Sequence, residues 1–212
     1  MASLLEQHAG ETKSQRRRRE VVDAARRVIA ERGLEATGLR QIARSAGFTT
    51  GVVTHHFPSK QSVIVAAFED ASAGWYAAAR DALSRASGPA ERVAVLARFG
   101  IPSDPVRRTE WRLWSEMWTY AGRNRDFAQT LLATDAVWEG MIREVLAEAR
   151  GAGLVHRDLD VSAEATVLAR LIEGLGLRAW LSGEWDDARR RLVRHLGMLG
   201  VPIEAREEAL RG

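Results

Sequence analysis

Residues 49–56 bring together groups that can form hydrogen bonds with a polyanion. Apart from two valines, they are Thr49, Thr50, Gly51, Thr54, His55 and His56. Short hydroxyl groups and planar imidazoles can reach the edges of bases and the phosphates of a nucleic acid. The sequence has no aspartate or glutamate between Glu35 and Glu69, so no carboxylate in this stretch repels phosphate. The pattern therefore indicates contact with DNA.

Two short helices joined by a tight turn are needed to present these groups. We predict helices over residues 39–46 and 50–56, because Gly47 lies where a sharp turn requires positive φ. Val53 and Phe57 are expected to hold the second of these helices against the first. The arrangement predicts a helix-turn-helix, whose second helix enters the major groove of DNA.

Residues around this motif are predicted to contact phosphate. Thr37 and Arg40 stand at the start of the helix at 39–46, and Lys60 stands at the start of the next helix along. Helix N-termini add their own attraction for phosphate. Arg16–Arg19 either reach the DNA backbone or an adjacent minor groove, or form a solvated, disordered tail. The sequence leaves both possibilities open.

The spacing of apolar residues predicts an all-α fold of about nine helices. The expected helices are residues 16–32, 39–46, 50–56, 59–86, 90–99, 106–122, 125–150, 161–181 and 186–199. We expect a disordered polar leader at 1–15, a helix-turn-helix domain at 16–60 and a larger helical domain at 61–212. Residues 1–60 carry eleven basic and six acidic residues, which is the charge expected of a DNA-binding module.

Several classes of function find no support in the sequence. The chain has no cysteine, so it has neither disulfides nor thiolate metal sites. His55 and His56 are adjacent and point about 100° apart on a helix, so they form no metal-binding pair. No secretory signal and no apolar stretch that could span a bilayer are found, and a cytoplasmic protein without a cofactor is expected. Nucleophile elbows, glycine-rich phosphate loops and HExxH are also absent, so we do not expect an enzyme.

The chain resembles the TetR family of transcriptional repressors. The resemblance rests on ERG at 31–33, IARSAG at 42–47 and HFPSK at 56–60, and it covers about residues 16 to 70. Where the family usually has a tyrosine in the recognition helix, this chain has Thr54, which is closer to the BetI-like branch. WRLWSEMW at 111–118 and LARLIEGLGLRAWLSG at 168–183 are also similar to the C-terminal domain of BetI-like regulators.

The resemblance implies a homodimer that binds a palindromic operator. In the family, the helices expected at 161–181 and 186–199 form a four-helix bundle across the two-fold axis. Small and apolar residues there would form the interface: Ala165, Leu168, Ala169, Ile172, Leu175, Gly176, Leu192 and Leu196. Periodicity does not say which partner a helix face meets, so the same residues could instead fill the core of one chain.

The resemblance also implies a cavity for a small-molecule inducer in the C-terminal domain. The wall candidates are Trp111, Trp114, Trp118, Asp135 and Trp138. Without the resemblance, a tryptophan stripe is more often plain core. Aromatic rings beside a carboxylate would suit a cationic ligand, including a quaternary ammonium, through cation–π contact.

The expected function is therefore a sequence-specific DNA-binding repressor that an inducer releases from its operator. One alternative is an architectural DNA-binding protein without an inducer, although such a protein would not require a large, tryptophan-rich second domain. A helical enzyme is the weaker alternative. Neither the operator nor the identity of the inducer follows from the sequence.

Overall fold

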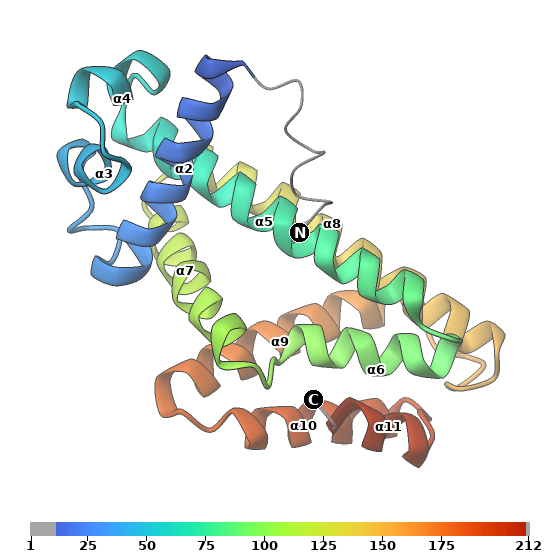
Figure 1. Ribbon diagram of the computed structural model, residues 1–212. Coiled ribbons are helices and arrows are strands. Elements are labelled where there is room, and N and C mark those ends of the chain that lie inside the picture. Colours follow the sequence, from blue (N-terminus) through green and yellow to red (C-terminus); the bar gives the residue numbers. More distant parts are fainter. Residues whose placement is uncertain (1–11, 211–212) are drawn as a thin grey trace. The chain divides into compact units, whose positions relative to one another are not determined.

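The computed structural model describes residues 12–210, without the side chains of residues 106 and 109. Within that range all regular secondary structure is helical, as predicted (Figure 1). The helices are α2 (Lys13–Arg32), α3 (Leu39–Ala46), α4 (Thr50–His56), α5 (Lys60–Arg85), α6 (Pro89–Gly100), α7 (Pro105–Ala121), α8 (Arg125–Gly151), α9 (Val161–Ser182), α10 (Trp185–Met198) and α11 (Ile203–Leu210).

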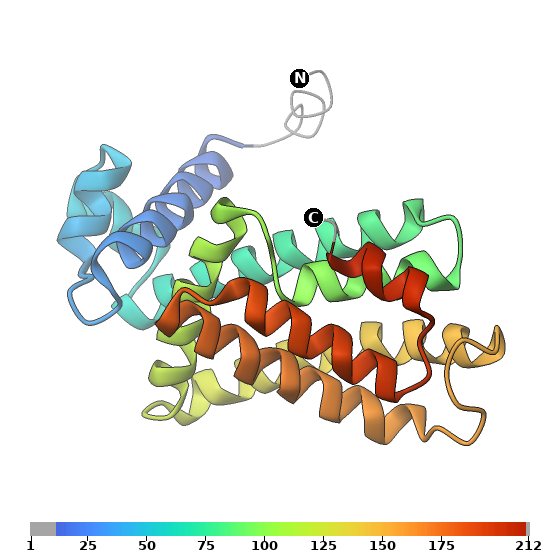
Figure 2. The ribbon, with the colours of Figure 1, turned by 90° about the horizontal axis from the view of Figure 1, so that it is seen from below.

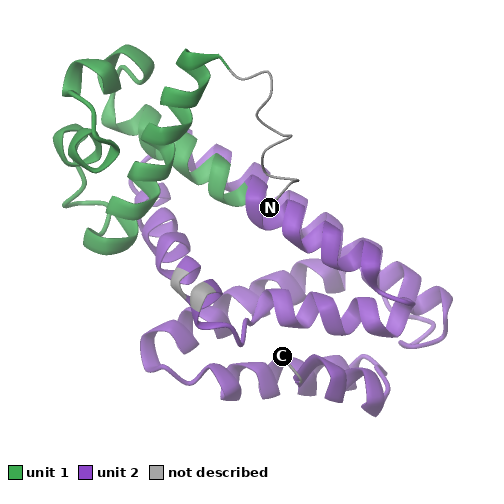
Figure 3. Cartoon of the chain, viewed as in Figure 1, with its two compact units in different colours: residues 1–72 green, residues 73–212 purple. Residues whose placement is uncertain are grey.

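The chain forms two compact units, which divide at Ser72 (Figure 3). Helix α5 begins in the first unit and ends in the second. The prediction that a DNA-binding domain ends at residue 60 and an effector-binding, dimerising domain follows is one about function, and it stays a prediction. The first eleven residues of the expected leader lie outside the described residues.

Helices α2, α3 and α4 pack against one another in the first unit. Helix α3 ends at Gly47, which has a φ of 72° and a ψ of 25°, and the N–H of Phe48 donates to the carbonyl of Ala43 at 2.9 Å. The predicted positive φ at Gly47 is therefore confirmed. Val53 and Phe57 are buried, so α4 turns its opposite face to solvent. This is the bent helix pair that the sequence predicts.

Helix α6 lies at the centre of the second unit. Seven of its residues are buried, and it contacts α8, α9, α10 and α11. Apolar residues dominate its last two turns, which places that part of the helix in the core. Figure 2 shows α9 and α10 side by side and α11 beside α6, while α7 packs on α8 and α9. Helices α6, α7, α8 and α9, together with the end of α5, line the space in which five of the tryptophans meet.

Most of the predicted helix bounds agree with the structure to within one residue, and there are two larger differences. Helix α2 begins at Lys13, three residues earlier than expected, because Thr12 and Gln15 form a capping box that satisfies the first free backbone N–H groups. Helix α11 was not predicted. It has only eight residues and buries only two alanines, so it carries no apolar stripe, and Arg98 of α6 holds it by donating to the carbonyl of Glu208 at 2.9 Å.

Candidate functional site

The exposed face of α4 presents the hydrogen-bonding groups that the sequence singled out. Thr49, Thr50, Gly51, Thr54 and His55 are all exposed. Thr49 is the N-cap of α4, but its side chain makes no capping hydrogen bond, and Thr54 donates to the carbonyl of Gly51 at 3.2 Å. The described geometry therefore leaves these groups at the surface, where a base edge or a phosphate could meet them.

The two adjacent histidines differ in their surroundings. His55 is exposed, whereas His56 is half-buried and lies with its ring centroid 5.1 Å from that of His55. Burial lowers the pKa of His56, and the positive charges of His55, Arg17 and Arg18 lower it further. His56 is therefore neutral near pH 7 and can accept a hydrogen bond as well as donate one.

Arg16–Arg19 belong to the first turns of α2, so in this structure they are not a disordered tail. Arg16 forms an exposed ion pair with Glu20 at 3.6 Å. The guanidinium of Arg18 lies 4.9 Å from the ring centroid of Phe57, the residue that ends α4. This contact ties the start of α2 to the end of α4. Contact of these arginines with DNA stays a prediction.

Two of the predicted phosphate contacts have structural roles. Thr37 is buried, and its hydroxyl donates to the carbonyl of Gly33 at 2.7 Å, which does not favour contact of its side chain with phosphate; that contact stays a prediction. Lys60 donates to the carbonyl of Leu34 at 2.9 Å and thereby holds the segment between α2 and α3. Arg40 is exposed at the start of α3.

Thr37→Val and Arg40→Ala are expected to separate structure from DNA contact. Thr37→Val should lower the free energy of unfolding in urea by about 1 kcal/mol, because the carbonyl of Gly33 loses its buried hydrogen bond. It should leave the salt dependence of DNA binding unchanged. Arg40→Ala should reduce the slope of log K against log salt by about one, measured by fluorescence anisotropy. If Thr37→Val also reduced this slope, the result would show that Thr37 does contact phosphate.

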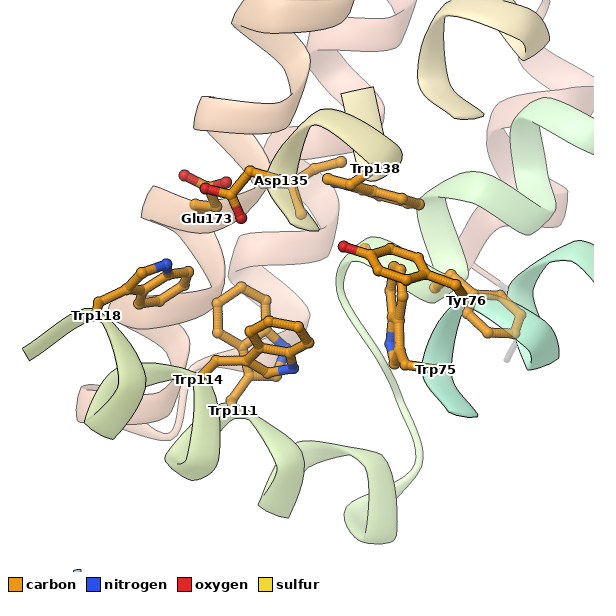
Figure 4. A pocket seen from close by; sticks show the side chains of 11 residues that line it. Trp75, Tyr76, Trp111, Trp114, Trp118, Asp135, Trp138 and Glu173 are labelled. Atoms are coloured by element: carbon orange, nitrogen blue, oxygen red, sulfur yellow. The ribbon is translucent and has the colours of Figure 1, made fainter. Parts of the chain in front are cut away.

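A cavity in the second unit is lined mainly by aromatic side chains (Figure 4). The space not filled by atoms is about 480 Å³, part of which is open to solvent. The volume open to the centre of a water-sized molecule is about 60 Å³. The lining residues are Trp75, Tyr76, Phe99, Gly100, Trp111, Trp114, Trp118, Asp135, Trp138, Ile172 and Glu173. They come from α5, α6, α7, α8 and α9, so the cavity exists only when these helices pack together.

Two groups of rings form the walls of the cavity, as Figure 4 shows. In one, Trp75 lies edge-on to Trp138, with centroids 4.8 Å apart, and edge-on to Tyr76 at 5.1 Å. In the other, Trp111 and Trp118 of α7 lie 5.9 Å apart. Tyr76 donates its hydroxyl to the carbonyl of Thr134 at 2.7 Å, which fixes its ring. Burial, followed by the charges of nearby carboxylates, raises the pKa of Tyr76, so it stays protonated.

Carboxylates occupy one end of the cavity. Asp135 and Glu173 line it, and Arg170 of α9 contacts them at 3.5 and 3.0 Å. The same guanidinium also contacts Glu139 at 2.8 Å. One guanidinium does not balance three carboxylates, so this end of the cavity favours positive charge.

The protonation of Glu173 depends on these neighbours. Burial raises the pKa of Glu173 to about 7, Arg170 opposes the shift, and the negative charges of Asp135 and Glu139 add to it. The pKa of Asp135 is also raised, again mainly by burial. Glu173 therefore changes its charge near neutral pH, inside a site whose other walls are aromatic.

The structure brings all five sequence-derived wall candidates to this one cavity. The sequence reasoning missed Trp75 and Tyr76, which lie on a different helix, although they stand in the long uncharged stretch at 71–79. It also missed Glu173, a single acidic residue between apolar neighbours in LIEGLG, which is a signal that could have been used. That this cavity binds an inducer is still a prediction.

The residues named for a dimer interface do not face outward. The structure buries seven of them within the chain itself: Ala165, Leu168, Ala169, Ile172, Gly176, Leu192 and Leu196. Leu175 is half-buried. The seven buried residues pack α9 and α10 into the core of the second unit, which leaves them little surface for a partner, and their role in a dimer interface stays a prediction.

Two further kinds of site were sought in the described part of the chain. Residues 12–210 contain no group of three or more histidine, aspartate or glutamate side chains arranged to hold a metal ion. None of the helices there is long and apolar enough to span a bilayer.

Family models match both parts of the chain. The model of the bacterial regulatory proteins of the tetR family matches residues 21–67, and the model of the C-terminal domain of BetI-type transcriptional repressors matches residues 89–200. The first match spans α3, α4 and the turn between them, and the second spans most of the lining of the cavity.

Relatives cover nearly the whole chain. The transcriptional regulator BetI of Escherichia coli strain UMN026 is 30% identical, over 89% of this chain and 95% of its own. The regulator PksA of Bacillus subtilis is 26% identical, over 88% and 91%. A Saccharomonospora viridis regulator solved with choline superposes with a TM-score of 0.78 at 24% identity, over 85% and 95%. A TetR-family regulator of Cytophaga hutchinsonii gives 0.80 at 18%, over 91% and 98%. The last two similarities show the fold.

Proposed function

The chain belongs to the TetR family of transcriptional regulators, with a BetI-type C-terminal domain, and we propose that it is a homodimeric repressor released from its operator by a small organic cation. Members of this family bind DNA and are not enzymes. A ligand that binds the DNA-free form more tightly shifts the protein away from its operator. The family therefore accounts for both a DNA-binding face and a cavity.

We assign the reading of DNA to α4. Its exposed threonines and His55 would enter the major groove, with Arg40 on the phosphates. The observation that supports this is the separation of its two faces: Val53 and Phe57 are buried, while the hydrogen-bonding residues are exposed. Lys60 already donates hydrogen bonds to the carbonyls of Leu34 and Glu35, so only its remaining N–H group would be available to a phosphate.

For dimerisation we propose the outer face of α9 rather than the residues that the sequence suggested. Val167 and Leu181 are 51% and 70% exposed, and the helical period places them on the same side, with Leu171, Gly174 and Arg178 between them. Exposed apolar side chains in a row are typical of a protein interface. Two copies of α9 and α10 would then meet through these faces.

Val167→Glu and Leu181→Glu are each expected to convert the dimer into monomers. A buried, unpaired carboxylate in an interface is costly, whereas both positions tolerate charge in a free monomer because they are exposed there. Light scattering after size-exclusion chromatography measures the mass. Ile203→Glu, at an exposed apolar position on α11, serves as the control and should remain dimeric. Dimers in all three variants would contradict the proposed face.

The cation is supported by the chain's own residues. Five tryptophans and a tyrosine surround the cavity, and two carboxylates stand at one end. Aromatic faces attract cations, most strongly cations that shed their water easily, such as quaternary ammonium ions. The Saccharomonospora viridis regulator, solved with choline, is a protein of the same fold that holds a ligand of this class.

The combined test is to select DNA sites from a random pool with the purified protein and then to titrate the complex with tetramethylammonium chloride. We expect a palindromic site and release of the DNA by the cation, but not by sodium chloride at the same concentration. Quenching of tryptophan fluorescence should occur over the same range. Binding without any sequence preference would favour an architectural protein instead.

A further inference from the structure

Gly176 lies in α9 where the ring of Trp111 covers the backbone. A Cβ atom built on Gly176 would overlap the ring carbons Cη2 and Cζ2 of Trp111 and would lie 2.6 Å from Cζ3. Carbon atoms in contact are separated by about 3.5–4.0 Å. Any side chain at position 176 must therefore displace the indole of Trp111.

The surroundings of Trp111 decide where the displaced ring would go. The ring centroid of Trp185 lies 6.3 Å from that of Trp111, and the ring centroid of Trp118 lies 5.9 Å from it. Trp111 is 9% exposed and lines the cavity, so the open space next to it is the cavity itself. A side chain at 176 would push the indole into the volume that a ligand needs.

We propose that Gly176 sets the size of the cation that the cavity admits, by letting the indole of Trp111 lie against α9. This inference rests on the proposed cation site. Gly176 touches no ligand in this scheme, so it is a positioning residue that determines specificity through Trp111. The role is specific to its position, because a Cβ on Gly140 of α8 or Gly174 of α9 would meet no atom within 4 Å.

The experiment compares the affinities of three cations of increasing size in wild type and in Gly176→Ala. Tetramethylammonium, choline and tetraethylammonium are titrated by isothermal calorimetry at pH 8. We expect Gly176→Ala to bind all three more weakly, with the loss for tetraethylammonium about tenfold larger than the loss for tetramethylammonium, as for a pocket that loses the room of a methylene group. Gly140→Ala is the matched control and should bind all three as wild type does.

A second change tests whether Trp111 transmits the effect. In Gly176→Ala combined with Trp111→Phe, the smaller ring leaves room for the methyl group, so binding of tetraethylammonium should recover relative to Gly176→Ala. Trp111→Phe alone should favour the larger cation compared with wild type, and it provides the test if Gly176→Ala does not fold. Melting temperatures measured by circular dichroism identify such a failure.

The proposal is overturned by an equal loss for all three cations, by an unchanged size preference, or by a double variant that does not recover. In each of these outcomes wild type still binds the cations, which distinguishes them from a failure of the proposed function. If wild type binds none of the cations, the assignment of the ligand class is wrong, and the role of Gly176 in selecting among cations falls with it.

Discussion

Replacing Glu173 with glutamine is expected to weaken the binding of tetramethylammonium about 10- to 100-fold at pH 8, and much less at pH 6. The size of the loss follows from removing one carboxylate within a few ångströms of a bound cation, at an effective dielectric constant of about 20 and after subtracting the cost of desolvation. Glutamine keeps the shape of the side chain, so the aromatic walls should stay in place.

The pH dependence follows from the direction of the pKa shift. Burial raises the pKa of Glu173 to about 7, so a fraction of the protein carries a neutral Glu173 at neutral pH. A bound cation favours the ionised carboxylate, and binding therefore releases a proton. The affinity of wild type should rise as the pH increases through 7 and become constant above about pH 8. In Glu173→Gln this step should be missing.

Other charged groups near Glu173 also affect how cation binding depends on pH. Asp135 and Glu139 face it from α8, and Arg170 contacts it from its own helix at 3.0 Å. These groups remain in Glu173→Gln, so a residual pH dependence at lower pH belongs to them. Glu144→Gln, at an exposed site of α8, is the control and should bind as wild type does at both pH values. A wild-type affinity that does not change between pH 6 and pH 8 would contradict the role of Glu173.

Replacing Thr50 with glutamate is expected to abolish specific DNA binding, with a loss of at least about 100-fold for the dimer on its palindrome. Thr50 is the first residue of α4 and is exposed, on the face proposed to enter the major groove. A carboxylate there would meet phosphates and the acceptor atoms of bases without a donor to offer.

The fold of Thr50→Glu should be unaffected, which separates DNA contact from stability. An acidic side chain in the first turn of a helix complements the helix dipole and is at worst neutral for stability. Circular dichroism melting and cation binding should therefore match wild type. Ala78→Glu, at an exposed site of α5 in the second unit, adds the same charge elsewhere and should retain nearly full affinity. Specific binding by Thr50→Glu would remove α4 from the recognition surface.

The helices and the turn at Gly47 could be predicted from the sequence because they depend on residues that are close together along the chain. The period of apolar residues located nine of the ten helices that residues 12–210 form, because a helix is built from contacts three and four residues apart. Gly47 was predictable because only a turn residue with positive φ can end α3 and begin a new helix so soon. Helix α11 was missed because its stability comes from contacts such as that of Arg98 with Glu208, distant in sequence.

Where the structure gives predicted site residues a role within the chain, the reason why the sequence could not show it is the same. A helical stripe shows which side chains share a face, but not what covers that face. Leu168 and Leu192 could have met a second copy of the chain, and the structure shows that they meet their own core. Thr37 stands near a helix start that could bind phosphate, but its hydroxyl donates its hydrogen bond to the carbonyl of Gly33.

By itself, then, the sequence determined the helices, the bent pair α3–α4 and the family, all of which follow from residue types at short, fixed spacing. Only the tertiary structure decided that Trp75 of α5 meets Trp138 of α8, that Arg170 binds three carboxylates, and that Trp111 lies on Gly176. Such contacts join helices far apart in the chain. Their geometry depends on how the helices pack, which no local pattern specifies.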